Sequence, residues 1–163
     1  MWIKKFTDVN MMKKDIEIRT MKIEDYTEVM ALWKGIKGFR IRAVDDDFEH
    51  IKRFLDRNMG LSVVAVKNNQ IVGTILSGHD GRQASFYHVC VDSKCRGENI
   101  AGKMVKEAIE RVNAEGISKI TLIAFKQNLA GNIFWKSQNW KQNKDINSYE
   151  LVLNEENISS IVA

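Results

Sequence analysis

The strongest constraint on the fold is a strand that breaks into a short polar turn and then leads into a long amphipathic helix. Residues 86–91 read as an apolar strand, and residues 92–99 form the turn, which carries Arg96 and Gly97. Apolar residues then recur at helical spacing from Ile100 to Val112. This order of elements predicts an α/β arrangement in which a strand and the following helix present the turn between them.

Such a turn is a candidate anion site. The first N–H groups of a helix have no partner within the helix, and the positive end of the helix dipole lies there. Arg96 adds a charged donor. We therefore expect a phosphate-bearing ligand between strand and helix, although the same connection is common in α/β proteins without any ligand. A nucleotide-binding domain is a weaker alternative, because the glycine and lysine spacings of the P-loop and of the dinucleotide fold are missing.

The order Val91, Arg96, Gly97 and Ala101 resembles the central acetyl-CoA-binding motif of the GCN5-related N-acetyltransferase (GNAT) superfamily. Asn99 stands where that family usually has its middle glycine, and asparagine tolerates a left-handed backbone better than most residues. The resemblance implies that the turn holds the pyrophosphate of acetyl-CoA and that the preceding strand holds its pantetheine arm. The residues implied in binding are Val89, Cys90, Val91, Arg96, Gly97, Glu98, Asn99, Ile100 and Ala101.

A second stretch, residues 128–140, resembles the family motif Asn-x-x-Ala-x-x-Phe-Tyr-x-x-x-Gly-Phe. The resemblance implies that Asn128 contacts the pantetheine arm, while a plain helix N-cap is an equally good reading of this residue. Trp135 stands where many members have a tyrosine that serves as general acid. It either packs against the cofactor, or leaves protonation of the thiolate to another group or to water, or marks a protein that binds acyl-CoA without efficient turnover. We favour the second explanation.

His88 is the candidate general base, with His79 as a weaker one, because histidine has an ordinary pKa close to neutrality. A histidine hydrogen-bonded within the sheet is at least as good a reading of His88. We take His88 and Trp135 as the candidate catalytic residues, and expect Cys90 to be a buried small side chain rather than a nucleophile. Strict alternation places Phe86, His88 and Cys90 on one face of the strand and Tyr87, Val89 and Val91 on the other.

The resemblance covers roughly residues 16–153 and implies an α/β (α+β) fold with a strongly twisted mixed sheet of six to seven strands and about four helices. We expect an N-terminal extension at 1–14 and one domain at 15–163. Periodicity and turn residues predict strands at 16–19, 61–66, 70–77, 84–91, 120–125 and 147–153. They predict helices from about 20, after Asp45–Asp47, from 100 and from 128, with a loop at 35–42 and a frayed tail after 154.

Composition narrows the class of protein. The net charge is +4, and the basic residues are scattered, so a nucleic-acid partner is not expected. No apolar run reaches the ~20 residues of a membrane span. Two cysteines without a histidine-rich partner segment do not suggest a metal site, and no secretory signal is recognised. We expect a cytoplasmic protein without a metal.

The resemblance therefore implies an N-acetyltransferase that transfers acetyl from acetyl-CoA to a primary amine by direct attack in a ternary complex. The acceptor is an amine of a small molecule, a peptide or a protein, and a homodimer is possible. The alternative is a catalytically weak acyl-CoA-binding or regulatory module. The three acids Asp45–Asp47 are best explained as helix-capping residues, with attraction of a cationic amine as a minority hypothesis.

Overall fold

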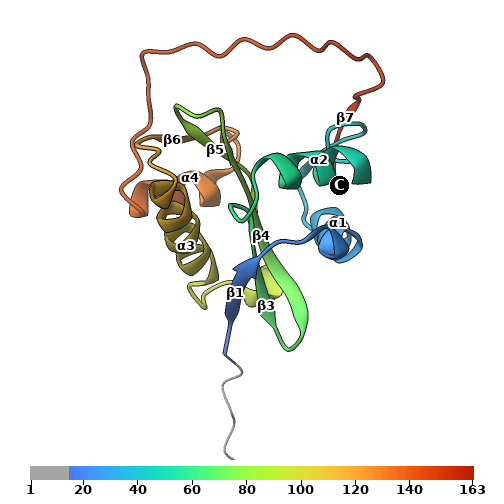
Figure 1. Ribbon diagram of the computed structural model, residues 1–163, viewed down its shortest axis with the longest axis vertical. Coiled ribbons are helices and arrows are strands. Elements are labelled where there is room, and N and C mark those ends of the chain that lie inside the picture. The colour runs from blue at the N-terminus through green and yellow to red at the C-terminus, as the bar shows by residue number, and fades with distance from the viewer. Residues whose placement is uncertain (1–14) are drawn as a thin grey trace, which may run out of the picture.

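A computed structural model describes residues 15–163; the extension expected at residues 1–14 lies outside them. Within the described residues, five strands form a central sheet in the order β1-β3-β4-β5-β6, and β2 pairs with β7 in a second, two-stranded sheet. Helices α1 and α2 lie on one side of the central sheet, and α3 and α4 on the other (Figure 1). The elements are β1 (Glu17–Thr20), α1 (Tyr26–Lys34), β2 (Arg40–Arg42), α2 (Phe48–Arg57), β3 (Val63–Lys67), β4 (Gln70–His79), β5 (Ala84–Val91), α3 (Ile100–Ala114), β6 (Ile120–Leu122), α4 (Leu129–Ser137) and β7 (Ser159–Ile161), with 3₁₀ turns at Ile23–Asp25 and Ser93–Cys95.

Local sequence signals explain several of these elements. Asn68 and Asn69 both take positive φ angles, 53° and 60°, in the two-residue turn that joins β3 to β4. Such angles favour the tight hairpin turns that match the twist of the strands. Helix α2 begins where the Asp47 carboxylate accepts a hydrogen bond from the N–H of His50 at 2.8 Å. The two strands predicted on either side of this turn and the predicted capping role of the acidic segment are confirmed.

The predicted fold class is confirmed, with the seven strands divided between two sheets. The strand predicted at 147–153 is wrong: residues 138–158 contain no helix or strand and pass over one end of the sheet to reach β7 (Figure 1). Tyr149, Leu151 and Leu153 alternate but are 83–90% exposed. Alternation favours a strand only where one face is buried against a core and a neighbour supplies hydrogen bonds.

The loop predicted at 35–42 is also partly wrong, because its last three residues form β2. Arg40 lies opposite Ile161 and Arg42 lies opposite Ser159 in the antiparallel pairing with β7. The partner strand lies about 120 residues later in the chain, within the segment predicted to be a frayed tail. No local pattern in either segment could indicate this pairing.

Two apolar cores lie on opposite faces of the central sheet. The core beneath α3 includes Met104, Ala108 and Phe86, and the core beneath α1 and α2 includes Trp33 and Ile51. Gly73 in β4 lets α3 approach the sheet closely, since a Cβ atom there would lie 2.8 Å from the Met104 Cε atom and 3.0 Å from the Cys90 carbonyl oxygen.

The parallel pair β5 and β6 separates along its length. Ala84, Ser85 and Phe86 pair with residues 120–122, and the pairing then stops. Strand β5 continues to Val91, where it pairs only with β4 on its other edge. The backbone of residues 87–91 therefore has no strand partner on the β6 side.

Candidate functional site

The turn that follows β5 has the backbone expected of an anion-binding loop. Gly97 has a φ angle of +83° and Asn99 a φ angle of +57°, so both are left-handed. The predicted tolerance of Asn99 for this conformation is confirmed. Asn99 is the N-cap residue of α3, yet its side chain makes no capping hydrogen bond. The first N–H groups of the helix therefore have neither an intrahelical acceptor nor a cap.

Charged side chains of the turn are divided between a salt bridge and solvent. Glu98 forms a salt bridge with Lys67 of β3. Arg96 is exposed and forms no salt bridge among residues 15–163. Its guanidinium is thus available to a ligand beside the helix N-terminus.

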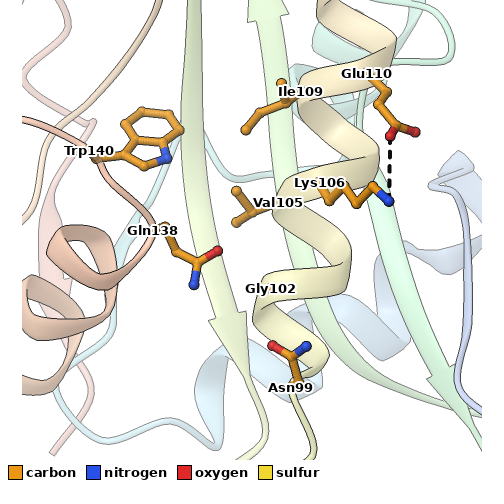
Figure 2. Close-up of a pocket in the computed structure, with 8 residues that line it drawn as sticks. All are labelled: Asn99, Gly102, Val105, Lys106, Ile109, Glu110, Gln138 and Trp140. Atoms are coloured by element: carbon orange, nitrogen blue, oxygen red, sulfur yellow. Dashed lines mark ion pairs between the residues drawn. The ribbon is translucent and has the colours of Figure 1, made fainter.

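A pocket of about 470 Å³ starts at this turn and lies between α3 and the segment after α4 (Figure 2). Asn99, Gly102 and Lys106 line it from the helix, and Gln138 and Trp140 line it from the segment after α4. Lys106 lies 3.9 Å from Glu110 and is largely exposed. The pocket borders the helix N-terminus and offers one aromatic and several polar side chains.

At the other end of the open edge, β5 contains a β-bulge. Thr74 and Leu76 of β4 pair with Cys90 and Tyr87 of β5. An interval of two residues in β4 therefore matches an interval of three residues in β5. His88 lies inside the bulge with a φ angle of +49°. An extra residue of this kind breaks the alternation of side chains along a strand.

The bulge overturns part of the faces predicted for β5: His88 and Cys90 share one face and Val89 and Val91 the other, as predicted, but Phe86 and Tyr87 each lie on the face opposite to the predicted one. Phe86, Val89 and Val91 pack in the core beneath α3, whereas Cys90 packs in the core beneath α1. The ring of His88 packs at a tilt against Trp33 of α1, and the ring of Tyr87 makes an edge-on contact with Phe54 of α2. Two consecutive side chains therefore face the same helices, and Phe86 and Cys90 lie on opposite faces.

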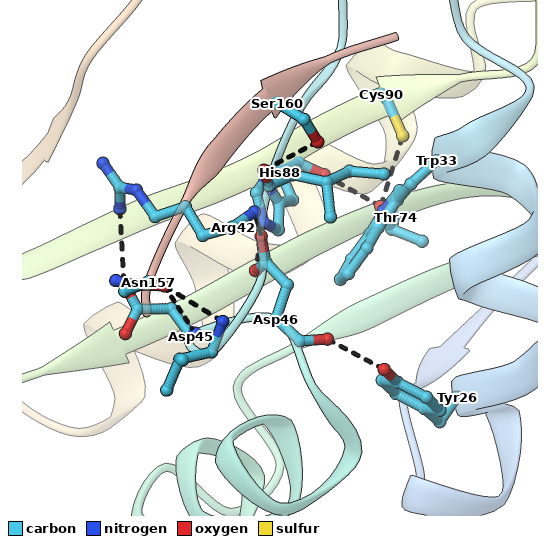
Figure 3. A network of polar contacts seen from close by, with 12 residues as sticks. Tyr26, Trp33, Arg42, Asp45, Asp46, Thr74, His88, Cys90, Asn157 and Ser160 are labelled. Carbon is cyan, nitrogen blue, oxygen red and sulfur yellow. Dashed lines mark hydrogen bonds and ion pairs between the residues drawn. The ribbon is translucent and has the colours of Figure 1, made fainter. Parts of the chain in front are cut away.

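The His88 ring is held by a carboxylate that the sequence analysis did not identify as its partner. His88 Nε2 lies 2.6 Å from Asp46 Oδ1, and Asp46 Oδ2 accepts a hydrogen bond from the N–H of Arg42 at 2.7 Å (Figure 3). Asp46 is 4% exposed. The hydroxyl of Tyr26 donates to the Asp46 carbonyl oxygen at 2.9 Å, which fixes the backbone as well. Only the position of Asp46 next to a capping residue is visible in the sequence.

A buried threonine supports the bulge from below. Thr74 Oγ1 donates to the His88 carbonyl oxygen at 2.8 Å and accepts from the indole N–H of Trp33 at 3.0 Å (Figure 3). Trp33 and Thr74 are both fully buried. The ring centroids of Trp33 and Phe39 lie 4.4 Å and 5.0 Å from that of His88. Backbone and ring of His88 are thus fixed independently.

His88 and Val89 line a groove of about 710 Å³ that runs from α2 and β2 to the separation of β5 and β6. Trp135 and Asn128 line its far side. Asn128 Oδ1 accepts from the N–H of Gly131 at 2.9 Å, so its predicted capping role is confirmed. Trp135 packs on Phe134 and Trp140, with ring centroids 5.0 Å and 4.9 Å away. The structure thus brings the two candidate catalytic residues to one groove.

The remaining candidates lie elsewhere. His79 accepts a hydrogen bond from the N–H of Gly81 in a surface turn and does not line the groove. Burial raises the pKa of the Cys90 thiol to about 12, against a weaker opposing effect of the hydrogen bond with Thr74. A neutral thiol is a poor nucleophile. This agrees with the expectation that Cys90 is a small buried side chain.

The part of the chain that the structure describes has neither a metal-binding cluster nor a membrane-spanning helix. Residues 15–163 contain no cluster of three or more His, Cys, Asp or Glu side chains that could hold a metal ion. None of their helices combines the length and apolar character needed to cross a membrane.

Solved structures with the same fold are acetyltransferases of several kinds. The PaiA N-acetyltransferase of Thermoplasma acidophilum, solved with coenzyme A, is 17% identical over 76% of this chain and 88% of its own, with a TM-score of 0.66. An aminoglycoside acetyltransferase from an uncultured soil metagenomic sample, in complex with sisomicin, is 19% identical over 85% and 97%, with a TM-score of 0.68. A predicted acetyltransferase of Clostridium acetobutylicum, solved with acetyl-CoA, is 18% identical over 86% and 99%, with a TM-score of 0.62.

The family itself is established by the sequence. The family model for the acetyltransferase (GNAT) family matches residues 24–140, which include the turn at 92–99, the bulge and the groove. This match confirms the resemblance to the GNAT superfamily. It also confirms the predicted acetyltransferase activity and the use of acetyl-CoA as co-substrate. The chain belongs to the acetyltransferase (GNAT) family, whose reaction is the transfer of an acetyl group from acetyl-CoA to an amine.

Proposed function

We propose that acetyl-CoA lies along the open edge of β5 and that the acceptor amine enters the groove on the α1 and α2 side, next to His88. One observation carries this proposal. The edge left free beyond Phe86 leads at one end to the uncapped N-terminus of α3 and passes at the other through the bulge into the groove. A thioester bound along it would meet an amine at the bulge.

The residues present fit such a ligand. The edge of residues 89–91 that faces away from β4 has no strand partner and can bond the amides of the pantetheine arm, as a neighbouring strand would. Gly97 and Asn99 present the helix N-terminus to the pyrophosphate, and Arg96 adds a charge-assisted donor. The pocket in Figure 2 borders this turn and gives the nucleotide end a hollow to occupy. Asn128, the N-cap residue of α4, lines the groove.

His88 is the proposed general base, and Asp46 is its positioning residue. The Asp46 carboxylate can only accept, so the imidazole proton lies on Nε2 and the lone pair on Nδ1. That nitrogen can take a proton from an attacking amine, and the nearby carboxylate stabilises the imidazolium that results. Acetyl-CoA supplies the acetyl thioester, and the chain's own residues orient it and hold the proton.

Trp135 serves as a packing wall of the groove in this proposal. Its indole N–H can donate a hydrogen bond but is no practical proton source. A thiol has an ordinary pKa of ~8.5, so the thiolate can leave near neutral pH and take its proton from water.

The experiment has two parts. Titration calorimetry with CoA, acetyl-CoA and ATP tests the binding site: Arg96→Ala should weaken CoA binding roughly tenfold, the effect of losing one charge-assisted hydrogen bond, and Arg82→Ala, in the surface turn before β5, should not. ATP bound as tightly as CoA would favour a nucleotide-binding domain. CoA affinity unchanged in Arg96→Ala would overturn the pyrophosphate assignment.

The second part is release of CoA thiol from acetyl-CoA with a panel of primary amines. An active enzyme should release CoA only when an amine is present, and mass spectrometry should detect the N-acetyl product. Tight acetyl-CoA binding without release for any amine would support the acyl-CoA-binding alternative.

A further inference from the structure

The part of the groove formed by β2 and α2, where the acceptor is proposed to enter, is rich in arginine. Four of the eight arginines of the chain line the groove, namely Arg40, Arg42, Arg53 and Arg57, and none of the thirteen lysines among residues 15–163 does. Arg40 and Arg42 come from β2, and Arg53 and Arg57 lie four residues apart on α2. β2 and α2 lie on the other side of the central sheet from α3, far from the turn at 92–99 that is proposed to bind the pyrophosphate (Figure 1). The arginines therefore surround the groove where the acceptor is proposed to enter.

The carboxylates of the groove do not neutralise this charge. Asp45 and Asp46 are the acidic residues that line it. Asp46 is taken by His88 and by the N–H of Arg42. Asp45 accepts from the Asn157 amide at 2.8 Å and lies 3.7 Å from Arg42. Within residues 15–163, no salt bridge involves Arg40, Arg53 or Arg57. Four guanidinium groups face two occupied carboxylates, a net charge of +2 with the histidines neutral.

Arg40 is held ready for an anion. Its guanidinium carbon lies 4.3 Å from the centroid of the Phe125 ring, across the groove from α2. Its Nε atom is buried and has no hydrogen-bond partner among the described residues. A buried donor without a partner is costly, and an anionic oxygen would satisfy it. Guanidinium groups suit carboxylates and phosphates because their donors match two oxygens at once.

We propose that the acceptor is a small amine that also carries an anionic group, a phosphate or a carboxylate, which this arginine cluster binds while the amine faces His88. The proposal rests on the function proposed above and narrows its substrate class. It runs against the idea that Asp45–Asp47 attract a cationic amine, because Asp47 caps α2 and the other two acids are already bonded. Repulsion by the cluster should exclude polyamines.

The test compares matched amines that differ in the anionic group. O-phosphoethanolamine is compared with ethanolamine, 4-aminobutyrate with 4-aminobutan-1-ol, and putrescine serves as the cationic member. CoA release should give a kcat/KM at least tenfold higher for the anionic member of at least one pair, and which pair responds distinguishes phosphate from carboxylate. The preference should shrink as salt rises, since screening weakens exposed charges.

Variants assign the effect to the cluster. In the double variant Arg53→Gln/Arg57→Gln, on an exposed face of α2, the preference should fall at least fivefold. The kcat/KM should fall more for the anionic amine than for the neutral one, and CoA affinity should stay close to that of the wild type. Arg82→Gln, in the surface turn outside the groove, is the matched control and should keep the preference. A double variant that lost CoA affinity would mean that these arginines bind CoA, which would overturn the proposal.

A binding measurement keeps the two proposals separable. Calorimetric titration of the same amine pairs into the CoA-saturated protein reports the anionic preference without turnover. Equal affinity within both pairs, or a preference for putrescine, overturns the anionic acceptor even if the protein is an active transferase. Failure to bind CoA counts against the proposed function alone, and the amine pairs are then compared on the free protein.

Discussion

Asp46 and His88 lie 42 residues apart in the chain, and their side chains meet at 2.6 Å in the wall of the groove where the acceptor amine is proposed to enter. The aspartate reaches the histidine because β2 and the segment before α2 fold over the bulge of β5. A buried carboxylate that orients an imidazole, with the other ring nitrogen left free, is an arrangement suited to proton transfer.

The first prediction concerns this pair. His88→Asn should reduce kcat by about 10²–10⁴, the usual range for a general base, because asparagine tolerates the left-handed backbone but cannot take the proton. Asp46→Asn should reduce kcat less and leave the KM for acetyl-CoA nearly unchanged. Steady-state kinetics check the roles, because loss of the base should lower kcat without raising the KM for acetyl-CoA. A kcat equal to that of the wild type in both variants would leave the pair a purely structural contact.

The second prediction concerns the threonine beneath the bulge. Thr74→Val should destabilise the protein by about 1–3 kcal/mol, because the Trp33 indole N–H and the His88 carbonyl oxygen would both lose a buried partner. Denaturant unfolding measures this loss. Thr74→Ser, which keeps the hydroxyl, is the matched control and should lose less; equal losses in both variants would indicate that packing of the methyl group dominates.

The third prediction concerns the left-handed N-cap of α3. Asn99→Gly should keep both CoA affinity and stability close to the wild type, since glycine takes a φ angle of +57° without strain. Asn99→Val should cost roughly 1–2 kcal/mol through backbone strain and should weaken CoA binding in calorimetry. If valine were tolerated as well as glycine, the turn would not depend on this conformation.

The fourth prediction uses two glycines with different surroundings. Gly73→Ala should cost about 1–3 kcal/mol, because the new methyl group would lie 2.8 Å from Met104 and 3.0 Å from the Cys90 carbonyl oxygen. Gly35→Ala is the control: its φ angle is −86° and its nearest neighbour would lie at 3.4 Å, so the unfolding free energy should change little. Thermal unfolding of both variants checks the contrast.

The fifth prediction concerns thiol reactivity. Burial raises the pKa of Cys90 to about 12, so its thiol stays protonated at neutral and mildly alkaline pH. In a Cys95→Ser variant, a disulfide reagent at pH 8 should label Cys90 slowly in the native protein and quickly after unfolding, where the pKa returns to its ordinary range. Rapid labelling of the native protein would mean that Cys90 is accessible as thiolate.

What the sequence determined is local. The strand, turn and helix from 86 to 114, the left-handed Asn99, the Asp47 cap and the Asn68-Asn69 hairpin all depend on residues within a few positions of one another. Backbone angles, capping bonds and apolar spacing act over that range, so pattern alone was enough. The same local motifs carried the resemblance to the family.

What only the tertiary structure decided depends on register between distant segments. The bulge follows from how β4 pairs with β5, and it placed Phe86 and His88 on opposite faces against the predicted alternation. The pairing of β2 with β7 and the meeting of Asp46 with His88 join segments 40 to 120 residues apart. The arginine cluster likewise forms only when β2 lies beside α2. Such contacts are selected by the packing of the whole chain, which no short stretch of sequence contains.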